Sequence, residues 1–322
     1  MDFIFEREIA RNTVVSASYL ASYGNSLPNF VDTNLNAPNR CGTFTAVGGP
    51  FNGVQWQIPL FLGARPNTAF AQITEIRSDV FSKYHALVLQ ANRRLTNGLQ
   101  FQANYTLSRA SDNGQSSTTF TTNNLPSNAF DQQNENGLSA FDRRQKFVAS
   151  VVYNTDYQFE SSTARAILNG WTVAPILNAF SGQRVTATVS NTMSPANNFG
   201  INSSTPGGGI NGSGGSTRFS FLPRNFFKQP NIWYVDMRLS RRFKITEGTN
   251  IEVLGEAFNL FNRTQVTGVN ATLYSIDTTG SLANPRPFVN FNGGTSGFFS
   301  VTGADSTLFR ERQVQLAVRF EF

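Results

Sequence analysis

The sequence predicts an all-β protein in which antiparallel strands form a transmembrane β-barrel. Three observations support this fold class: strands in which apolar and polar residues alternate, short turns that alternate with long polar connections, and a chain end that closes on an aromatic residue. Successive side chains of a strand point to opposite faces. Alternation over a membrane-length strand therefore gives one face that suits lipid and one that suits water, as a barrel wall requires.

Alternation predicts about nine strands. After the turn at Thr96-Asn97-Gly98, Leu99 and Phe101 share one face while Gln102 and Asn104 share the other, and Asn-Gly is a strong hairpin signal. The predicted strands lie near 2–10, 12–24, 81–94, 98–109, 144–155, 169–189, 230–244, 249–262 and 309–322. Most of them are long enough to cross a bilayer at the usual tilt.

The connections between these strands are of two kinds. Those near 11, 95–97 and 245–248 are tight, and 156–168 is moderate. The long ones, rich in Asn, Ser, Thr and Gly, are 25–80, 110–143, 190–229 and 263–308. Transmembrane barrels have short periplasmic turns and long extracellular loops. We therefore expect the long loops to lie outside the cell and to hold the substrate specificity. We also expect them to be mobile, above all at 203–216, where apolar residues are scarce.

The chain ends in a strand that reads as a membrane-insertion signal. Its apolar face consists of Val314, Leu316, Val318, Phe320 and Phe322, and the chain stops on the last of these. The barrel-assembly machinery of outer membranes reads a terminal strand of alternating apolar residues closed by Phe. We expect this strand to direct insertion.

The two faces lead to specific predictions of sidedness. Leu99, Phe101, Leu239, Leu316 and Phe320 are expected to face lipid. Gln102, Asn104 and the charged residues Asp236, Arg238, Glu252, Glu256 and Arg319 are expected to face the lumen. Glu252 and Glu256 could also suggest acid–base catalysis, but on one strand they lie about 13 Å apart, which favours lumen-facing charge.

Composition excludes several other classes. The formal charge of +6 is compatible with nucleic-acid binding, but the basic pairs Arg93-Arg94, Arg143-Arg144 and Arg241-Arg242 sit at strand ends, where long side chains can reach lipid head groups. No apolar run is long enough for a transmembrane helix. Cys41 and His85 are the only residues of their types, which disfavours a disulfide framework, a zinc site and a hydrolase triad. Asp112, Asp131 and Asp142 lack calcium-loop spacing. We expect no cofactor, no nucleic acid and no enzyme activity.

The segment NIWYVDMRLSRRFKITEGTNIEVLGEAFNLFNRTQ resembles the penultimate hairpin of TonB-dependent outer-membrane receptors, in particular their Oar-like, large-barrel branch. The matching residues are Asp236, Ser240, Arg241 and Phe243, then Glu256, Phe258, Asn259, Leu260, Phe261 and Asn262. The resemblance implies a 22-stranded barrel in a Gram-negative outer membrane, plugged by an N-terminal domain. It also implies energy relayed by the TonB system.

The chain departs from that pattern at its start, because MDFIFEREIA already reads as strand. We expect neither a signal peptide nor a plug domain within these residues. We expect residues 1–322 to be the C-terminal portion of the barrel, roughly strands 14 to 22. The leading hypothesis is a receptor or transporter that captures or moves an unidentified substrate. A surface adhesin or structural barrel without transport is the alternative, and a soluble β-sandwich or secreted enzyme is the third.

Overall fold

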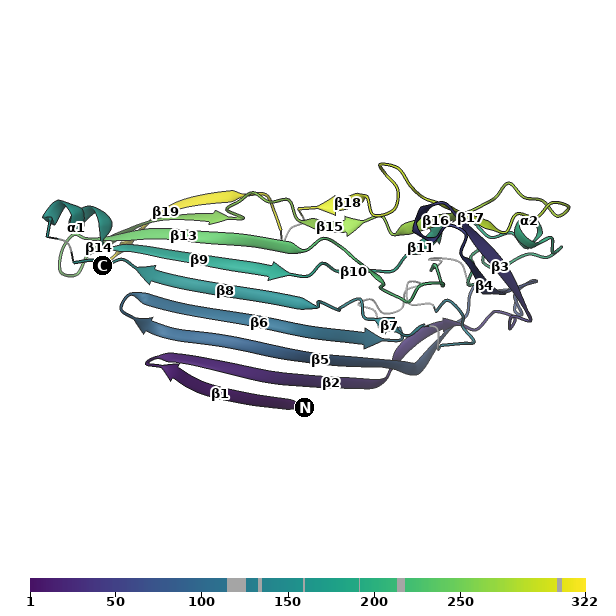
Figure 1. Ribbon diagram of the computed structural model, residues 1–322, viewed down its shortest axis with the longest axis horizontal. Helices are drawn as coiled ribbons and strands as arrows, with labels where there is room; N and C mark the ends of the chain where they lie inside the picture. The colour runs from purple at the N-terminus through teal and green to yellow at the C-terminus, as the bar shows by residue number, and fades with distance from the viewer. Residues whose placement is uncertain (115–125, 133–134, 159, 191, 213–217, 306–308) are drawn as a thin grey trace.

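Nine antiparallel strands lie side by side in one long sheet (Figure 1). The structure is a computed structural model, which describes residues 1–322 except 115–125, 133–134, 159, 191, 213–217 and 306–308. The sheet order follows the chain: β1 (Asp2–Ala10), β2 (Thr13–Asp32), β5 (Thr74–Thr96), β6 (Leu99–Asp112), β8 (Gln145–Asn154), β9 (Trp171–Phe180), β13 (Ile232–Lys244), β14 (Asn250–Phe258) and β19 (Gln313–Glu321). A tenth strand, β7 (Gly137–Leu138), pairs with β6 at Ser111 and Asp112. We call this end of the long sheet its upper end. Each predicted strand coincides with one of the nine.

Some strand limits differ from the prediction. The pair β2 and β5 continues well beyond residue 24, because its extension buries Val31 and Val80 completely at the top of the sheet. Conversely, β9 ends at Phe180 and not at 189. At Gly182 the chain lies so close to the Gln229 carbonyl that a Cβ there would be 1.8 Å from its oxygen. This close approach turns the chain out of the long sheet.

The tight turn between β5 and β6 has the geometry that its residues predict. Asn97 has φ of 51° and Gly98 has φ of 74°, which is the region that Asn and Gly tolerate. A Cβ at Gly98 would also lie 2.4 Å from the carbonyl oxygen of Asn154. The moderate connection after β8 holds a short helix, α1 (Ser162–Leu168), capped by Ser161. Among the described residues, no helix has both the length and the apolar character needed to cross a membrane.

The long connections form a second, folded layer at the opposite end from α1 (Figure 1). We call it the loop layer. Its centre is a five-stranded sheet in the order β11 (Thr188–Ser190), β16 (Thr272–Ile276), β17 (Phe288–Phe291), β3 (Arg40–Val47) and β4 (Gln55–Leu60). Two small pairs accompany it: β10 (Arg184–Val185) with β12 (Phe227–Lys228), and β15 (Val266–Val269) with β18 (Val301–Ala304). Two short helices, η1 (Gly49–Phe51) and α2 (Pro195–Phe199), complete the layer.

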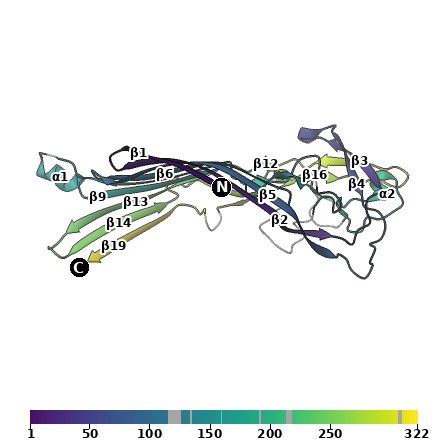
Figure 2. The same cartoon turned by 90° about the horizontal axis from the view of Figure 1, so that it is seen from below.

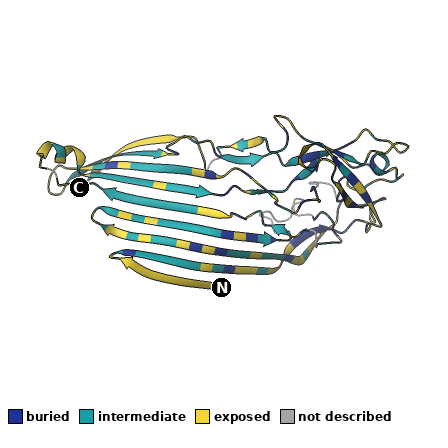
Figure 3. Cartoon of the chain, in the orientation of Figure 1, coloured by how far each residue is buried: buried dark blue, intermediate teal, exposed yellow. Residues whose placement is uncertain are grey.

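The loop layer has its own hydrophobic core. Phe44, Ile58, Phe219, Tyr274 and Val289 are fully buried in one cluster, and Figure 3 shows buried residues concentrated at this end while the long sheet is mostly half-buried or exposed. The expectation that 203–216 lacks ordering apolar residues is wrong at Ile210, which belongs to this core; residues 213–216 lie outside the described part. Cys41, predicted in a loop, is an exposed residue of β3.

Candidate functional site

The register of the long sheet produces one face that is mainly apolar and one that is mainly polar. One cross-strand row is made of Leu99, Tyr153, Val173, Leu239, Gly255 and Leu316, each directly paired with the next. Another row, on the other face, runs through Gln102, Ser150, Ile176 and Asp236. The five residues predicted to face lipid therefore share one face, and those predicted to face the lumen share the other. Which face meets lipid stays a prediction.

Aromatic and basic side chains border the apolar face at both ends. Near the loop layer, the guanidinium of Arg263 lies 5.0 Å from the ring centre of Trp233. At the other end, Arg241 lies over the rings of Trp171 and Phe243, at 5.3 and 5.0 Å. Trp233 and Phe243 are about 33 Å apart along the strand at roughly 3.3 Å per residue. At a tilt of about 40° this gives an apolar band about 25 Å tall, the height of a barrel's lipid-facing band.

The charged residues predicted on the polar face come together on three neighbouring strands. Arg238 of β13 lies 3.7 Å from Glu252 and 3.8 Å from Glu256, both on β14. Arg319 of β19 lies 3.3 Å from Glu252 on its other side. Each glutamate therefore has an arginine partner, which suits structural pairing and a charged lining better than proton transfer. Asp236 is not part of this cluster.

Asp236 instead lines a cavity of about 230 Å³ at the upper end of the polar face. The other lining residues are Tyr234, Phe258, Asn259, Gln265, Phe309, Arg310, Glu311 and Gln313. The Asp236 carboxylate accepts a hydrogen bond of 2.9 Å from the backbone N–H of Asn259. Gln265 is buried and its amide exchanges two hydrogen bonds with the backbone of Trp233, at 2.8 and 3.2 Å. The cavity thus combines aromatic walls with charged groups, a lining suited to a small polar solute.

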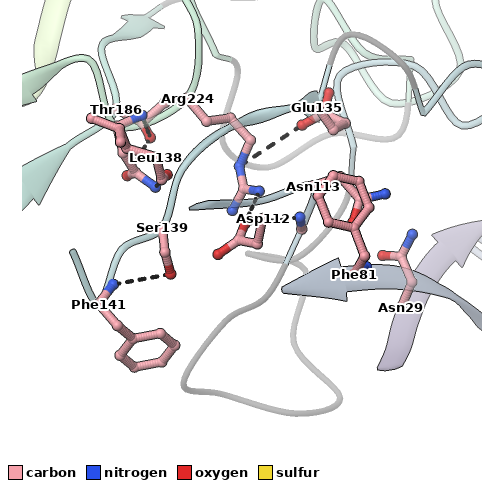
Figure 4. Close-up of polar contacts among 12 residues, drawn as sticks. Asn29, Phe81, Asp112, Asn113, Glu135, Leu138, Ser139, Phe141, Thr186 and Arg224 are labelled. Atoms are coloured by element: carbon pink, nitrogen blue, oxygen red, sulfur yellow. Dashed lines mark hydrogen bonds and ion pairs between the residues drawn. The ribbon is translucent and has the colours of Figure 1, made fainter. Parts of the chain in front are cut away.

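Buried ion pairs attach the loop layer to the long sheet. Asp112, at the end of β6, is completely buried and lies 2.7 Å from Arg224 of the loop layer. Glu135 lies 3.9 Å from Arg224 (Figure 4) and 3.5 Å from Arg218. Burial lowers the pKa of Arg218, and the charge of Glu135 partly opposes that shift. Because buried charges need partners, these pairs fix how the loop layer sits on the sheet.

Two more carboxylates at the upper end of the sheet make similar contacts. Asp142 lies 2.8 Å from Arg184, and Asp32 lies 2.7 Å from Arg65. From their spacing in the sequence, Asp112 and Asp142 could be tested only as ligands of a bound calcium ion. In the structure, each of them has an arginine partner that is remote in sequence, so spacing along the chain gave no signal for these pairs. Among the described residues, no three His, Cys, Asp or Glu side chains gather as a metal site.

Asp277 holds together the turn that follows β16. Its carboxylate accepts hydrogen bonds from the hydroxyl and the backbone N–H of Thr279, at 2.6 and 2.8 Å, and from Arg286 at 2.9 Å. The bonds from Thr279, with the smaller contribution of Arg286, lower the pKa of Asp277 to about 2. The side chain is therefore ionised throughout the physiological range.

The residues predicted as the insertion signal lie on β19 at one edge of the sheet. Val314, Leu316, Val318 and Phe320 are all more than half exposed on the apolar face, and Phe322 is fully exposed after the strand. Their role in insertion stays a prediction.

Comparisons with known proteins found a family model and several solved structures that are similar to this chain. A family model described as an outer membrane beta barrel domain matches residues 1–315. Solved structures that are similar include the outer membrane transporter YddB from Escherichia coli, at 10% identity with a TM-score of 0.47, over 99% of this chain and 32% of that chain. Another is FpvA of P. aeruginosa bound to heterologous pyoverdines, at 12% identity with a TM-score of 0.41, over 100% of this chain and 32% of that chain. A third is the copper transporter OprC, at 10% identity with a TM-score of 0.33, over 99% and 38%. No curated protein matches. The chain spans about a third of the length of the solved structures it matches.

Proposed function

The chain belongs to the outer membrane beta barrel domain family, and we propose that its long sheet is part of the wall of a receptor or transporter that captures an unidentified substrate and moves it across the outer membrane of a Gram-negative bacterium. The family assignment confirms the predicted fold class and location. Transport, substrate capture and the sidedness of individual residues belong to the proposal.

One observation carries the proposal: one face of the sheet stays apolar through the register of all nine strands, while the polar residues lie mainly on the other face. A wall with such faces divides lipid from water. On its polar side, the cluster of Arg238, Glu252, Glu256 and Arg319 gives the lumen paired charges. The cavity at Asp236 lies above that cluster, below the loop layer, where a solute from outside would first meet the wall.

The resemblance of the β13–β14 hairpin to TonB-dependent receptors supports active transport. In this proposal, residues 1–322 supply the C-terminal portion of a larger barrel. Other parts of the protein supply the remaining strands, the plug and the contact with TonB. The need for more strands follows from β1 and β19, whose outer edges have no partner strand among the described elements. A strand edge in lipid must be paired.

The folded loop layer favours a second candidate, a surface adhesin or structural barrel without transport. Its hydrophobic core holds the outer surface in one shape before any partner arrives, and a preformed surface suits binding as well as substrate capture.

Solute uptake distinguishes the two candidates. The test compares the parent strain with a strain that lacks the gene, both grown in a defined medium. We expect the parent strain to remove at least one solute from the medium that the strain without the gene leaves there. A strain without TonB should share this defect, and a Glu252→Gln, Arg319→Gln variant with normal surface levels should show a partial one. Identical depletion by parent and deletion strains, combined with lost attachment to surfaces, would favour the adhesin.

A further inference from the structure

A hollow with three basic residues lies where β5 and β6 pass into the loop layer. Its volume is about 610 Å³. Phe81, Lys83, Arg109, Ser111 and Asp112 contribute from the two strands. The other walls are the strand β7 with its preceding residue, 136–138, and the loop-layer segment Pro223, Arg224 and Phe226.

The register places the cations of this hollow on the apolar face of the sheet. Leu87 pairs with Leu107 as the last apolar pair of that face. Two residues further along, His85 pairs with Arg109, and after two more, Lys83 pairs with Ser111. Residues two apart in a strand share a face. Lys83 and Arg109 therefore continue the apolar face upward, beyond the band, and do not point to the polar side.

Aromatic side chains mark the upper limit of the apolar band at the same place. The hydroxyl of Tyr19 lies 2.8 Å from Nδ1 of His85, and the ring of Tyr23 meets the His85 ring edge-on at 5.3 Å between ring centres. Tyr side chains with an apolar body and a polar tip are characteristic of the membrane–water interface. Arg109, paired across the strands with His85, thus lies at head-group depth.

Two of the three cations that line the hollow have no counter-charge among the residues that the structure describes. Arg224 is paired with Asp112. Lys83 and Arg109 are exposed, and neither forms an ion pair with any residue that the structure describes. The Lys83 ammonium lies 5.2 Å from the ring centre of Phe81, and Phe226, 49% exposed, forms an apolar wall. Exposed cations beside an uncovered apolar face are complementary to an anionic amphiphile.

We propose that this hollow binds the phosphate-bearing head group of a lipid of the outer leaflet, with the acyl chains lying on the apolar face below it. Lys83 and Arg109 donate charge-assisted hydrogen bonds to the phosphate oxygens. Apolar rows from Leu87 and Leu107 downward receive the chains. The inference rests on the proposed orientation, in which the apolar face meets lipid and the loop layer lies outside.

Lipid binding by the complete purified protein in detergent tests this site. The probe is a bisphosphorylated, acylated glucosamine disaccharide, and bound lipid is counted by native mass spectrometry during titration. We expect Lys83→Gln with Arg109→Gln to weaken binding by about tenfold or more, because two charge-assisted contacts are lost. The matched control is Arg94→Gln with Lys244→Gln, which removes the same charges from exposed residues at the other end of the sheet, on the polar face.

Further comparisons separate the possible ligands. The dephosphorylated form of the same lipid should bind the original protein as weakly as the phosphorylated form binds the double variant. Equal binding of the phosphorylated lipid by the double variant and the original protein would overturn the proposal. Complete displacement by millimolar inorganic phosphate would also overturn it, in favour of a soluble anion. The assay does not depend on transport. Lipid binding at the hollow can therefore be disproved while the proposed function holds, and the proposed function can be disproved while lipid binding holds.

Discussion

Asp112 is a single carboxylate that connects two layers of the molecule. It ends a strand of the wall, is completely buried, and lies 2.7 Å from Arg224 of the loop layer. Removing one member of a buried ion pair costs more than the pair contributes, because the remaining charge stays buried without compensation.

We therefore expect Asp112→Asn to destabilise the attachment of the loop layer by about 3 kcal/mol. Glu135, at 3.9 Å from Arg224, compensates only part of the loss. The measurement is hydrogen exchange at the amide of Ser139, which donates to the carbonyl of Ala110 beside this pair. Asp156→Asn, which changes an exposed aspartate in the moderate connection after β8, is the control. Unchanged protection of Ser139 would show that the pair does not hold the layers together.

Asp277 makes the turn after β16 sensitive to acid. Its pKa of about 2 in the folded protein is below the ordinary value of 3.8 for an aspartate, so between these two values the unfolded state binds more protons, and stability rises with pH. The stabilisation is fully present above about pH 4 and is lost as the pH falls toward 2. Amide protection at Thr279 should decrease over that window. Asp277→Asn should remove this pH dependence, and a decrease that persists in the variant would assign it to another group.

At the scale of the strand, the register makes the two faces separately testable. Leu239 lies about midway between Trp233 and Phe243 on the apolar face. Leu239→Arg should destabilise the complete protein by about 2–4 kcal/mol, as measured by urea unfolding in lipid vesicles. Gln102→Arg, an exposed residue of the polar face, should cost much less. Equal costs, or quenching of a spin label at residue 102 by a lipid-soluble reagent, would contradict the assignment of the faces.

The terminal strand leads to a prediction about assembly. Phe322 closes the apolar face of β19 and is fully exposed. Phe322→Asp should reduce outer-membrane levels of the complete protein without changing its synthesis, as quantified by immunoblot of membrane fractions. Phe322→Tyr keeps the aromatic ring and should retain normal levels. Normal levels of the aspartate variant would remove the insertion-signal hypothesis.

The wall strands could be predicted from the sequence because their signal is local. Alternation is visible within ten residues, and Asn97-Gly98 defines its own turn. The loop layer could not be predicted in this way. The alternation of Trp56, Ile58 and Leu60 in β4 is present in the sequence, and its partner β3 lies in the same connection. The strands β16 and β17, which continue that sheet, come from the remote connection 263–308, and burial there compensates for the Gly and Asn content. The charged cluster was found from the strand pattern; the pairs of Asp32, Asp112 and Asp142 were not, because each arginine comes from another part of the chain or from a loop.

At the scale of the whole molecule, the sheet is curved and open (Figure 2). Its outer strands, β1 and β19, each have one edge without a partner among the described elements. Unpaired edges promote association with other chains. We expect residues 1–322, expressed alone, to form aggregates or heterogeneous oligomers in detergent, as measured by size-exclusion chromatography with light scattering. A monodisperse, closed monomer would show that the two edges can pair with each other.

The strand order of the loop layer also determines when it can form. The parallel pairs join residues 188–190 to 272–275 and residues 45–47 to 288–290, so the first and the last long connections share one sheet. Contacts between such distant segments form slowly, because a long stretch of chain must be ordered before they can be made. The wall hairpins have local contacts and can form one after another in sequence order. The loop layer should therefore form last, after the hairpins of the long sheet are in place, and a pulse of hydrogen–deuterium labelling during refolding would record that delay.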